Sequence, residues 1–222
     1  IAALRTGAGL VTVGTPEAVH GVLEEKLTEV MTEPLGCDAD GRLDVSSLAA
    51  ITARLRDSDA LAVGPGIGRA PGVSSLVTAA LEEAAANGVS VVIDADGLNA
   101  LADSGPPPHG LEQVRSSGVN AVLTPHPGEL GRLLGLTPDE IQADRIKHAA
   151  AAARLSRAVV VLKGAGTVVV APEGNMALNT TGNSGLASGG TGDVLTGIIV
   201  GLLAQGLQPM GAACAAVYSH GK

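Results

Sequence analysis

Short apolar runs rich in valine, isoleucine and leucine alternate along this chain with longer stretches of helical pattern. Within the segments 60–63, 90–96 and 159–164, runs of apolar residues occur without the polar alternation of a half-exposed strand. Uninterrupted apolar strands are typical of parallel sheets that helices cover on both faces. The sequence therefore predicts one α/β domain with three layers, α/β/α, around a mostly parallel central sheet.

The expected elements follow from the same patterns. Strands are expected at 9–15, near Val30, at 60–63, 90–96, 121–129 with a break at Pro125, and 159–164, with a hairpin over 167–178. Helices are expected at 16–27, 46–56, 71–86, 137–155, about 191–205 and 209–219. A short helix after the strand at 90–96 is followed by a loop rich in glycine and proline at 105–110. Thr137 precedes Glu140 by three residues, the spacing of a capping box.

Composition excludes several classes of protein. The 222 residues are 45% hydrophobic and 16% charged, which rules out wholesale disorder. Phe and Trp are absent, so the chain offers no aromatic platform for stacked bases, and its net charge of −8 argues against a nucleic-acid or anionic-membrane partner. No apolar stretch reaches the ~18 residues of a membrane span. Cys37 and Cys214 lie far apart without metal-ligand spacing, which indicates a reducing, cytoplasmic location.

A glycine-rich string before an apolar helix is the strongest candidate for a functional site. Residues 188–193 read SGGTGD and lead directly into that helix. Glycines let backbone N–H groups approach a ligand, and a helix start adds partial positive charge, so Gly189, Gly190, Thr191 and Gly192 are predicted to form an anion hole. Asp193, in the first helical turn, is placed to accept a proton from a substrate hydroxyl.

Four other unusual strings each follow a predicted strand: GPGIG at 64–68, DADGLN at 94–99, TPHPGE at 124–129 and LKGAGT at 162–167. Because ligands of parallel sheets bind outside the carboxyl ends of the strands, these strings are expected to meet there. GPGIG satisfies neither the dinucleotide-binding nor the P-loop spacing. His126, fixed between two prolines, is the best histidine candidate. Lys163 ends an apolar strand, where its ammonium would meet phosphate or solvent, and the glycines after it suit a flat ligand.

Taken singly, these features also fit plainer interpretations. Asp193 would serve as an ordinary acidic helix start, the glycines at 64–68 as a simple turn, and Lys163 as a solvated lysine. The order of all five strings is more specific than any one of them.

In that order the strings resemble the ADP- or ATP-dependent NAD(P)H-hydrate dehydratases of the ribokinase-like superfamily, and the resemblance runs from residue 7 to 221. The resemblance implies a ribokinase-like fold and a metabolite-repair reaction, in which the S epimer of NADH or NADPH hydrate loses water at the expense of a nucleotide. The hydroxyl is phosphorylated and phosphate then leaves, which restores NAD(P)H.

The resemblance also implies roles for particular residues. Asp193 resembles the family's catalytic aspartate. Gly68, His126 and Asp193 resemble the residues that bind the hydrate. The implied nucleotide-binding residues are Lys163, Gly164, Ala165, Gly166, Thr167 and Gly192. Mg²⁺ is expected with the phosphates, without a metal-ligand set of its own on the protein. A homo-oligomer such as a tetramer is implied, and the choice between ADP and ATP stays open.

Two departures and two alternatives accompany this hypothesis. We expect a single domain over 1–222 that lacks the family's first strand and last helix, since the family's pattern extends beyond both ends. The first alternative is a ribokinase-like vitamin-precursor kinase, which would share the anion hole and the aspartate but release a stable phosphorylated product. The second is a non-catalytic nucleotide-binding module, which would need the glycines but not Asp193.

Overall fold

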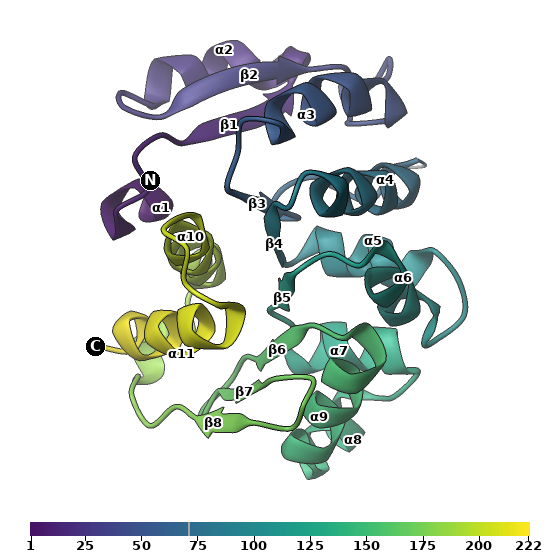
Figure 1. Cartoon of the computed structure of the whole chain (residues 1–222), viewed down its shortest axis with the longest axis vertical. Helices are drawn as coiled ribbons and strands as arrows, with labels where there is room; N and C mark the ends of the chain where they lie inside the picture. The colour runs from purple at the N-terminus through teal and green to yellow at the C-terminus, as the bar shows by residue number, and fades with distance from the viewer. Residues whose placement is uncertain (71) are drawn as a thin grey trace.

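The computed structural model describes residues 1–70 and 72–222 of the chain, and its strands form two sheets. The larger sheet has six strands in the order β3-β4-β5-β6-β7-β8, and the smaller pairs β1 with β2 (Figure 1). The strands are β1 (Thr12–Pro16), β2 (Met31–Leu35), β3 (Ala60–Val63), β4 (Ser90–Ile93), β5 (Ala121–Leu123), β6 (Val159–Leu162), β7 (Val168–Val170) and β8 (Met176–Leu178).

The helices of the described residues alternate with these strands. They are α1 (Ala2–Thr6), α2 (Glu17–Lys26), α3 (Leu48–Leu55), α4 (Val73–Ala86), α5 (Asp96–Asp103), α6 (His109–Ser117), α7 (Pro127–Leu134), α8 (Pro138–Ala143), α9 (Arg145–Ser156), α10 (Thr191–Ala204) and α11 (Pro209–His220). Two 3-10 turns, Val45–Ser47 and Ser184–Leu186, precede α3 and α10.

The large sheet is mostly parallel, as the sequence predicts. Strands β3, β4, β5 and β6 pair in parallel, and β6, β7 and β8 pair antiparallel. The antiparallel part is the hairpin expected at 167–178, in which Val169 faces Ala177. Parallel neighbours bring their carboxyl ends to one edge of the sheet, and that edge is where the unusual sequence strings lie.

Helices cover the two faces of the large sheet and complete the three layers. Helices α4 to α9 lie on one face, and α10 and α11 on the other (Figure 1). Side chains alternate along each strand, so Val91 and Ile93 of β4 pack with the first group while Val92 packs with α10 and α11. These strand residues are fully buried, which explains why the strands are continuously apolar.

The two-stranded sheet lies beyond the β3 end of the large sheet, with α2 and α3 beside it (Figure 1). Its strands pair in parallel, with Gly14 opposite Glu33, and they are less buried than β4 to β7. Helix α1 packs on α10 instead, where Gly201 allows the backbone of Ala3 to approach closely. The strands predicted at 9–15 and near Val30 are therefore present but stand apart from the main sheet.

The prediction of a single helix over 137–155 is wrong. The structure has two helices, α8 and α9, separated at Asp144, whose backbone leaves the helical region at φ −148° and ψ 71°. The Asp144 carboxylate accepts a hydrogen bond from the Lys147 amide and so caps α9. The capping box at Thr137 and Glu140 is present, as predicted.

Other differences are local. The loop predicted at 105–110 ends inside a helix, because α6 starts at His109 and buries Gly110 against Leu101. The strand expected at 121–129 stops at Leu123, and the one expected at 90–96 stops at Ile93, because helices α7 and α5 begin soon afterwards. The helix predicted from Pro71 begins at Val73, and Pro71 itself lies outside the described residues. Among the described helices, none is long and apolar enough to cross a membrane.

Candidate functional site

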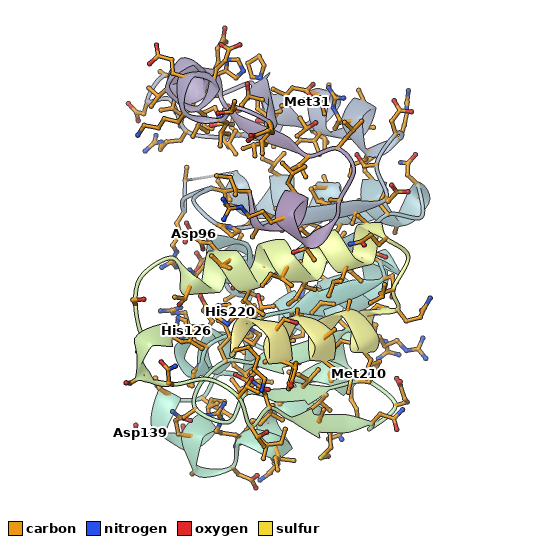
Figure 2. All side chains as sticks on the ribbon, turned by 90° about the vertical axis from the view of Figure 1, so that its left-hand side faces the viewer. Met31, Asp96, His126, Asp139, Met210 and His220 are labelled. Carbon is orange, nitrogen blue, oxygen red and sulfur yellow. The ribbon has the colours of Figure 1, made fainter. Side chains whose placement is uncertain are left out.

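The carboxyl ends of β4, β5 and β6 bring three sequence strings to one edge of the large sheet. Asp94 follows β4, the segment 124–129 follows β5, and Lys163 follows β6. Figure 2 places Asp96 and His126 on the same side of the molecule. The structure thus gathers the strings that the parallel topology predicts to meet.

Asp94 is the centre of a buried polar cluster. Its side chain is 1% exposed, and its Oδ1 accepts a hydrogen bond from Lys163 Nζ at 2.6 Å. Its Oδ2 accepts one from Thr196 Oγ1 at 2.7 Å. A buried carboxylate is tolerated only when it is paired and hydrogen-bonded, and both conditions hold here. Asp94 therefore ties the end of β6 to the second turn of α10.

Glu129 lies on the other side of Lys163. Its Oε2 is 3.8 Å from Lys163 Nζ and accepts a hydrogen bond from the His126 backbone amide at 2.8 Å. Burial raises the pKa of the Glu129 carboxyl above its ordinary value, while Lys163 acts in the opposite direction. Lys163 consequently stands between two carboxylates, one directly after β4 and the other in the first turn of α7.

His126 caps helix α7 with its side chain. Its Nδ1 accepts hydrogen bonds from the backbone amides of Gly128 at 3.0 Å and Glu129 at 3.3 Å, and Glu129 completes a capping box. Burial, together with the charges of Lys163 and Arg132, lowers the pKa of His126 below its ordinary value. This shift favours the neutral ring, and because Nδ1 is an acceptor, the proton of the neutral ring lies on Nε2, 3.3 Å from Glu129 Oε1.

The start of α10 presents free backbone N–H groups. Gly190 has φ +86°, a conformation that favours glycine, and within the described chain no side chain caps the helix. Thr191 Oγ1 bonds back to the carbonyls of Leu186 and Ser188, which fixes the preceding loop. Asp193 is exposed in the first turn. An uncapped helix start with an adjacent carboxylate is an arrangement that suits an anionic ligand and a proton acceptor.

Gly192 connects this helix start to the buried cluster. A Cβ at position 192 would lie 3.7 Å from Lys163 Nζ and 4.0 Å from Asp94 Oδ2. The ammonium group and the helix start therefore face the same small volume, and both favour negative charge there. Of the predicted residues, Gly192 and Lys163 are the pair that the structure brings together.

Gly68 belongs to a separate series of hydrogen bonds. Its amide donates to Asp96 Oδ2 at 3.0 Å, Asn99 Nδ2 donates to Asp96 Oδ1 at 3.3 Å, and Arg132 donates to Asn99 Oδ1 at 2.7 Å. These bonds hold the glycine loop after β3 against α5 and α7. The Gly68 amide is thus satisfied within the protein, and in the described residues no hydrogen bond joins Gly68 to Asp193.

Sequence reasoning assigned no role to three members of the site, although two of them, Asp94 and Glu129, lie in strings that it singled out. Asp94 and Thr196 meet across 102 residues, and Asp94 and Lys163 across 69, so no local spacing signals either pairing. Glu129 did carry a signal, since it follows the capping residue His126 by three positions, as in a capping box. Among the described residues, no group of three His, Cys, Asp or Glu side chains is arranged to hold a metal ion by itself.

The three-layer fold and the glycine-rich helix start beside a buried ion pair define a protein of the ribokinase-like class. A solved ribokinase-like protein of Enterococcus faecalis is similar to 99% of this chain, with a TM-score of 0.75 and 26% identity. The family model described as NAD(P)H-hydrate dehydratase matches residues 1–222. The chain belongs to this family, which confirms the resemblance seen in the sequence.

Individual relatives agree. The bifunctional NAD(P)H-hydrate repair enzyme of Moorella thermoacetica is 46% identical over 99% of this chain, and the Escherichia coli enzyme is 39% identical. The chain spans 40% and 38% of those proteins. The Bacillus subtilis ADP/ATP-dependent NAD(P)H-hydrate dehydratase, co-crystallised with ATP and Mg²⁺, has a TM-score of 0.74 and 34% identity, and the match covers 99% of this chain and 73% of that one.

Proposed function

We propose that this chain catalyses the nucleotide-dependent dehydration of the S epimer of NADH or NADPH hydrate, a lyase reaction that repairs the cofactor. The hydrate hydroxyl attacks the terminal phosphoryl group of ADP or ATP and gives its proton to Asp193, and the bond to the bridging oxygen breaks so that AMP or ADP leaves. The carbon–oxygen bond then breaks, phosphate leaves with the bonding electrons, and the neighbouring ring carbon releases a proton. The ring double bond is thereby restored.

The observation that carries this proposal is the meeting of the α10 start with Lys163. A Cβ placed on Gly192 would lie 3.7 Å from Lys163 Nζ, and Asp193 follows in the same helical turn. Phosphoryl transfer requires little covalent chemistry from the protein beyond positioning, charge stabilisation and a base. The helix start and lysine would stabilise the transferring group, and Asp193 would accept the proton.

The nucleotide is proposed to lie along the loop from Lys163 to Thr167, with its terminal phosphoryl group against Gly189, Gly190, Thr191 and Gly192. Residues Gly164, Ala165 and Gly166 are exposed, so a flat base or ribose has access to their backbone. Mg²⁺ usually keeps several waters and takes one or two carboxylates besides the phosphates. Asp94 and Glu129 are buried, and both carboxylates already face the Lys163 ammonium, so the cation would be held chiefly by the phosphates and water. When bound, the cation would neutralise phosphate charge.

The hydrate is proposed to contact Gly68, His126 and Asp193. The imidazole of His126 is 48% exposed, and its Nε2 lies 3.3 Å from Glu129 Oε1, a contact that would orient the ring. The exposure supports a role in which the accessible edge of the ring donates to a polar group of the substrate.

We further propose a cytoplasmic homo-oligomer, such as a tetramer, and a single domain over 1–222. Both cysteines are free, which suits a reducing compartment. Exposed apolar side chains such as Leu10, Met31 and Leu178 leave surface for association.

The test is the absorbance at about 340 nm, where dihydronicotinamide absorbs, with S-NADH hydrate, Mg²⁺ and either ADP or ATP. The proposal predicts a nucleotide-dependent rise, and the nucleotide that produces it is the donor. A stable phosphorylated product without a rise would indicate a kinase. Nucleotide binding without any turnover would indicate a binding module.

Gly192→Val is expected to weaken nucleotide binding by roughly tenfold to a hundredfold, because branched methyl groups would enter the space between Lys163 and the helix start. Calorimetric titration with the Mg²⁺ complex of the nucleotide measures this. The control is Gly211→Val, since Gly211 lies in the first turn of α11 with nothing near its Cβ position. Equal affinity in both variants would mean that Gly192 does not border the phosphates.

His126→Ala and His126→Asn separate two roles of one side chain. The alanine variant loses the cap of α7 and is expected to lose about 1 kcal/mol of stability, whereas asparagine keeps a capping acceptor. Both lack the Nε2 donor, so both should raise the KM for the hydrate. Thermal unfolding and steady-state kinetics measure the two effects. An unchanged KM in both variants would remove His126 from the substrate site.

A further inference from the structure

One guanidinium holds the backbone of the proposed nucleotide loop. Arg145 Nη1 donates to the Ala165 carbonyl at 3.0 Å. Its Nη2 donates to the carbonyls of Leu162 at 3.0 Å and Lys163 at 3.3 Å. Three carbonyls at the end of β6 and in the following loop thus accept from a single side chain of α9. By contrast, the one side-chain bond within the loop is that from Thr167 Oγ1 to the Gly164 carbonyl at 3.0 Å.

Gly164 and Arg145 are matched in shape. A Cβ at position 164 would lie 2.7 Å from Arg145 Nη1, and Gly164 has φ +144°, which L side chains rarely adopt. The guanidinium therefore lies directly against the glycine backbone. This close approach explains why position 164 requires glycine, and the sequence string LKGAGT alone does not show it.

The charge of Arg145 is not neutralised by a carboxylate. In the described part of the chain, no Asp or Glu lies within ion-pair distance of Arg145, and its partners are carbonyl oxygens only. Burial lowers the pKa of the guanidinium from its ordinary value, but an arginine stays charged at neutral pH. A positive charge thus lies directly behind the loop that would border the nucleotide.

The helix break at Asp144 sets this geometry. Arg145 is the first residue of α9, and Asp144 caps that helix through the Lys147 amide. Had α8 and α9 formed one continuous helix, as the sequence pattern suggests, residue 145 would not stand at a helix start. The break therefore places the guanidinium at the strand end where Lys163 leaves β6.

We propose that Arg145 is a positioning residue for nucleotide binding, which holds residues 162–165 so that Lys163 reaches Asp94 and the loop keeps the shape that receives the nucleotide. This inference rests on the proposed function. Arg145 acts through the loop backbone, and its planar fork of N–H groups is what spans three carbonyls. A lysine ammonium at the same position offers a single point of charge and cannot donate to all three carbonyls at once.

The test compares Arg145→Gln and Arg145→Lys with wild type, and uses Lys147→Gln as the control. Lys147 is an exposed cation on the same turn of α9, and its side chain has no loop contact. The affinity for the Mg²⁺ complex of ADP or ATP is measured by calorimetry, and the KM values for nucleotide and hydrate by steady-state kinetics. Thermal unfolding sets a temperature at which each variant is folded.

We expect Arg145→Gln to raise the dissociation constant and the KM for nucleotide about tenfold or more, because bonds from a charged donor are lost. The KM for the hydrate should stay within about twofold. Arg145→Lys should recover part of the affinity, and Lys147→Gln should match wild type. A merely structural role would lower thermal stability without separating the two KM values.

Two outcomes would overturn the inference: unchanged nucleotide affinity in Arg145→Gln, or equal rises in both KM values. Full recovery by Arg145→Lys would also contradict it, since charge alone would then suffice. If the wild-type protein binds no nucleotide, the proposed function is wrong. If the wild type binds nucleotide and Arg145→Gln binds it equally well, only the inference about Arg145 is wrong.

Discussion

Asp193→Asn is expected to lower turnover by between about 100-fold and 10,000-fold, the usual range for a lost general base. Asparagine has nearly the same shape but cannot take up the hydroxyl proton. Asp193 is exposed and makes no side-chain hydrogen bond within the described chain, so the substitution leaves packing intact. The helix start loses one favourable charge, which is worth less than about 1 kcal/mol.

Three measurements check this expectation: kcat from the absorbance assay, nucleotide affinity from calorimetry, and unfolding from circular dichroism. Asp139→Asn is the matched control, because Asp139 is likewise an exposed acid in the first turn of a helix, α8. Turnover of Asp193→Asn within about threefold of wild type would refute the base. Loss of nucleotide binding with normal folding would instead place Asp193 in the nucleotide site.

Lys163→Met is expected to destabilise the fold by about 3 kcal/mol, because it leaves the Asp94 carboxylate buried without its ion-pair partner. Thr196 would remain as a single hydrogen-bond donor to that carboxylate.

Urea unfolding of three variants measures this effect. Lys163→Met alone should lose the full amount, the double variant Lys163→Met with Asp94→Asn should recover part of it, and the exposed Lys147→Met should stay within about 0.5 kcal/mol of wild type. A loss below about 0.5 kcal/mol in Lys163→Met would mean that the Asp94 pair does not stabilise the fold. Failure of the double variant to recover stability would mean the same.

The central architecture was predictable because it depends on local patterns. Continuous apolar runs predict buried parallel strands, and the pattern at 167–178 predicts the hairpin, since both follow from which side chains must be buried. The break at Asp144 was not predictable from periodicity, because apolar residues continue at helical spacing on both sides of it. Helix α6 was missed because the prolines and glycines before it are typical of a loop.

Some features of the candidate site were likewise predictable from local sequence, and others were not. The glycine string at 188–193 and the lysine after β6 were identified because their chemistry is visible in a few consecutive residues. The string that starts at Asp94 was also singled out, but its pairing with Thr196 was not predictable, because it depends on a contact across 102 residues. Arg145 lies in a helix whose sequence shows no sign that its guanidinium turns to a neighbouring loop. Tertiary contacts, which no local spacing encodes, decide these positions.

The most direct test of the proposed reaction follows the oxygen of the hydrate hydroxyl. The hydrate is prepared with ¹⁸O in that hydroxyl and incubated with the enzyme, Mg²⁺ and the preferred nucleotide, and the inorganic phosphate is analysed by mass spectrometry. If the hydroxyl is phosphorylated at the start of α10 and then leaves as phosphate, the ¹⁸O appears in inorganic phosphate, one atom for each NAD(P)H restored. Recovery of the ¹⁸O in water, with unlabelled phosphate, would contradict phosphorylation of the hydroxyl and with it the role assigned to Asp193.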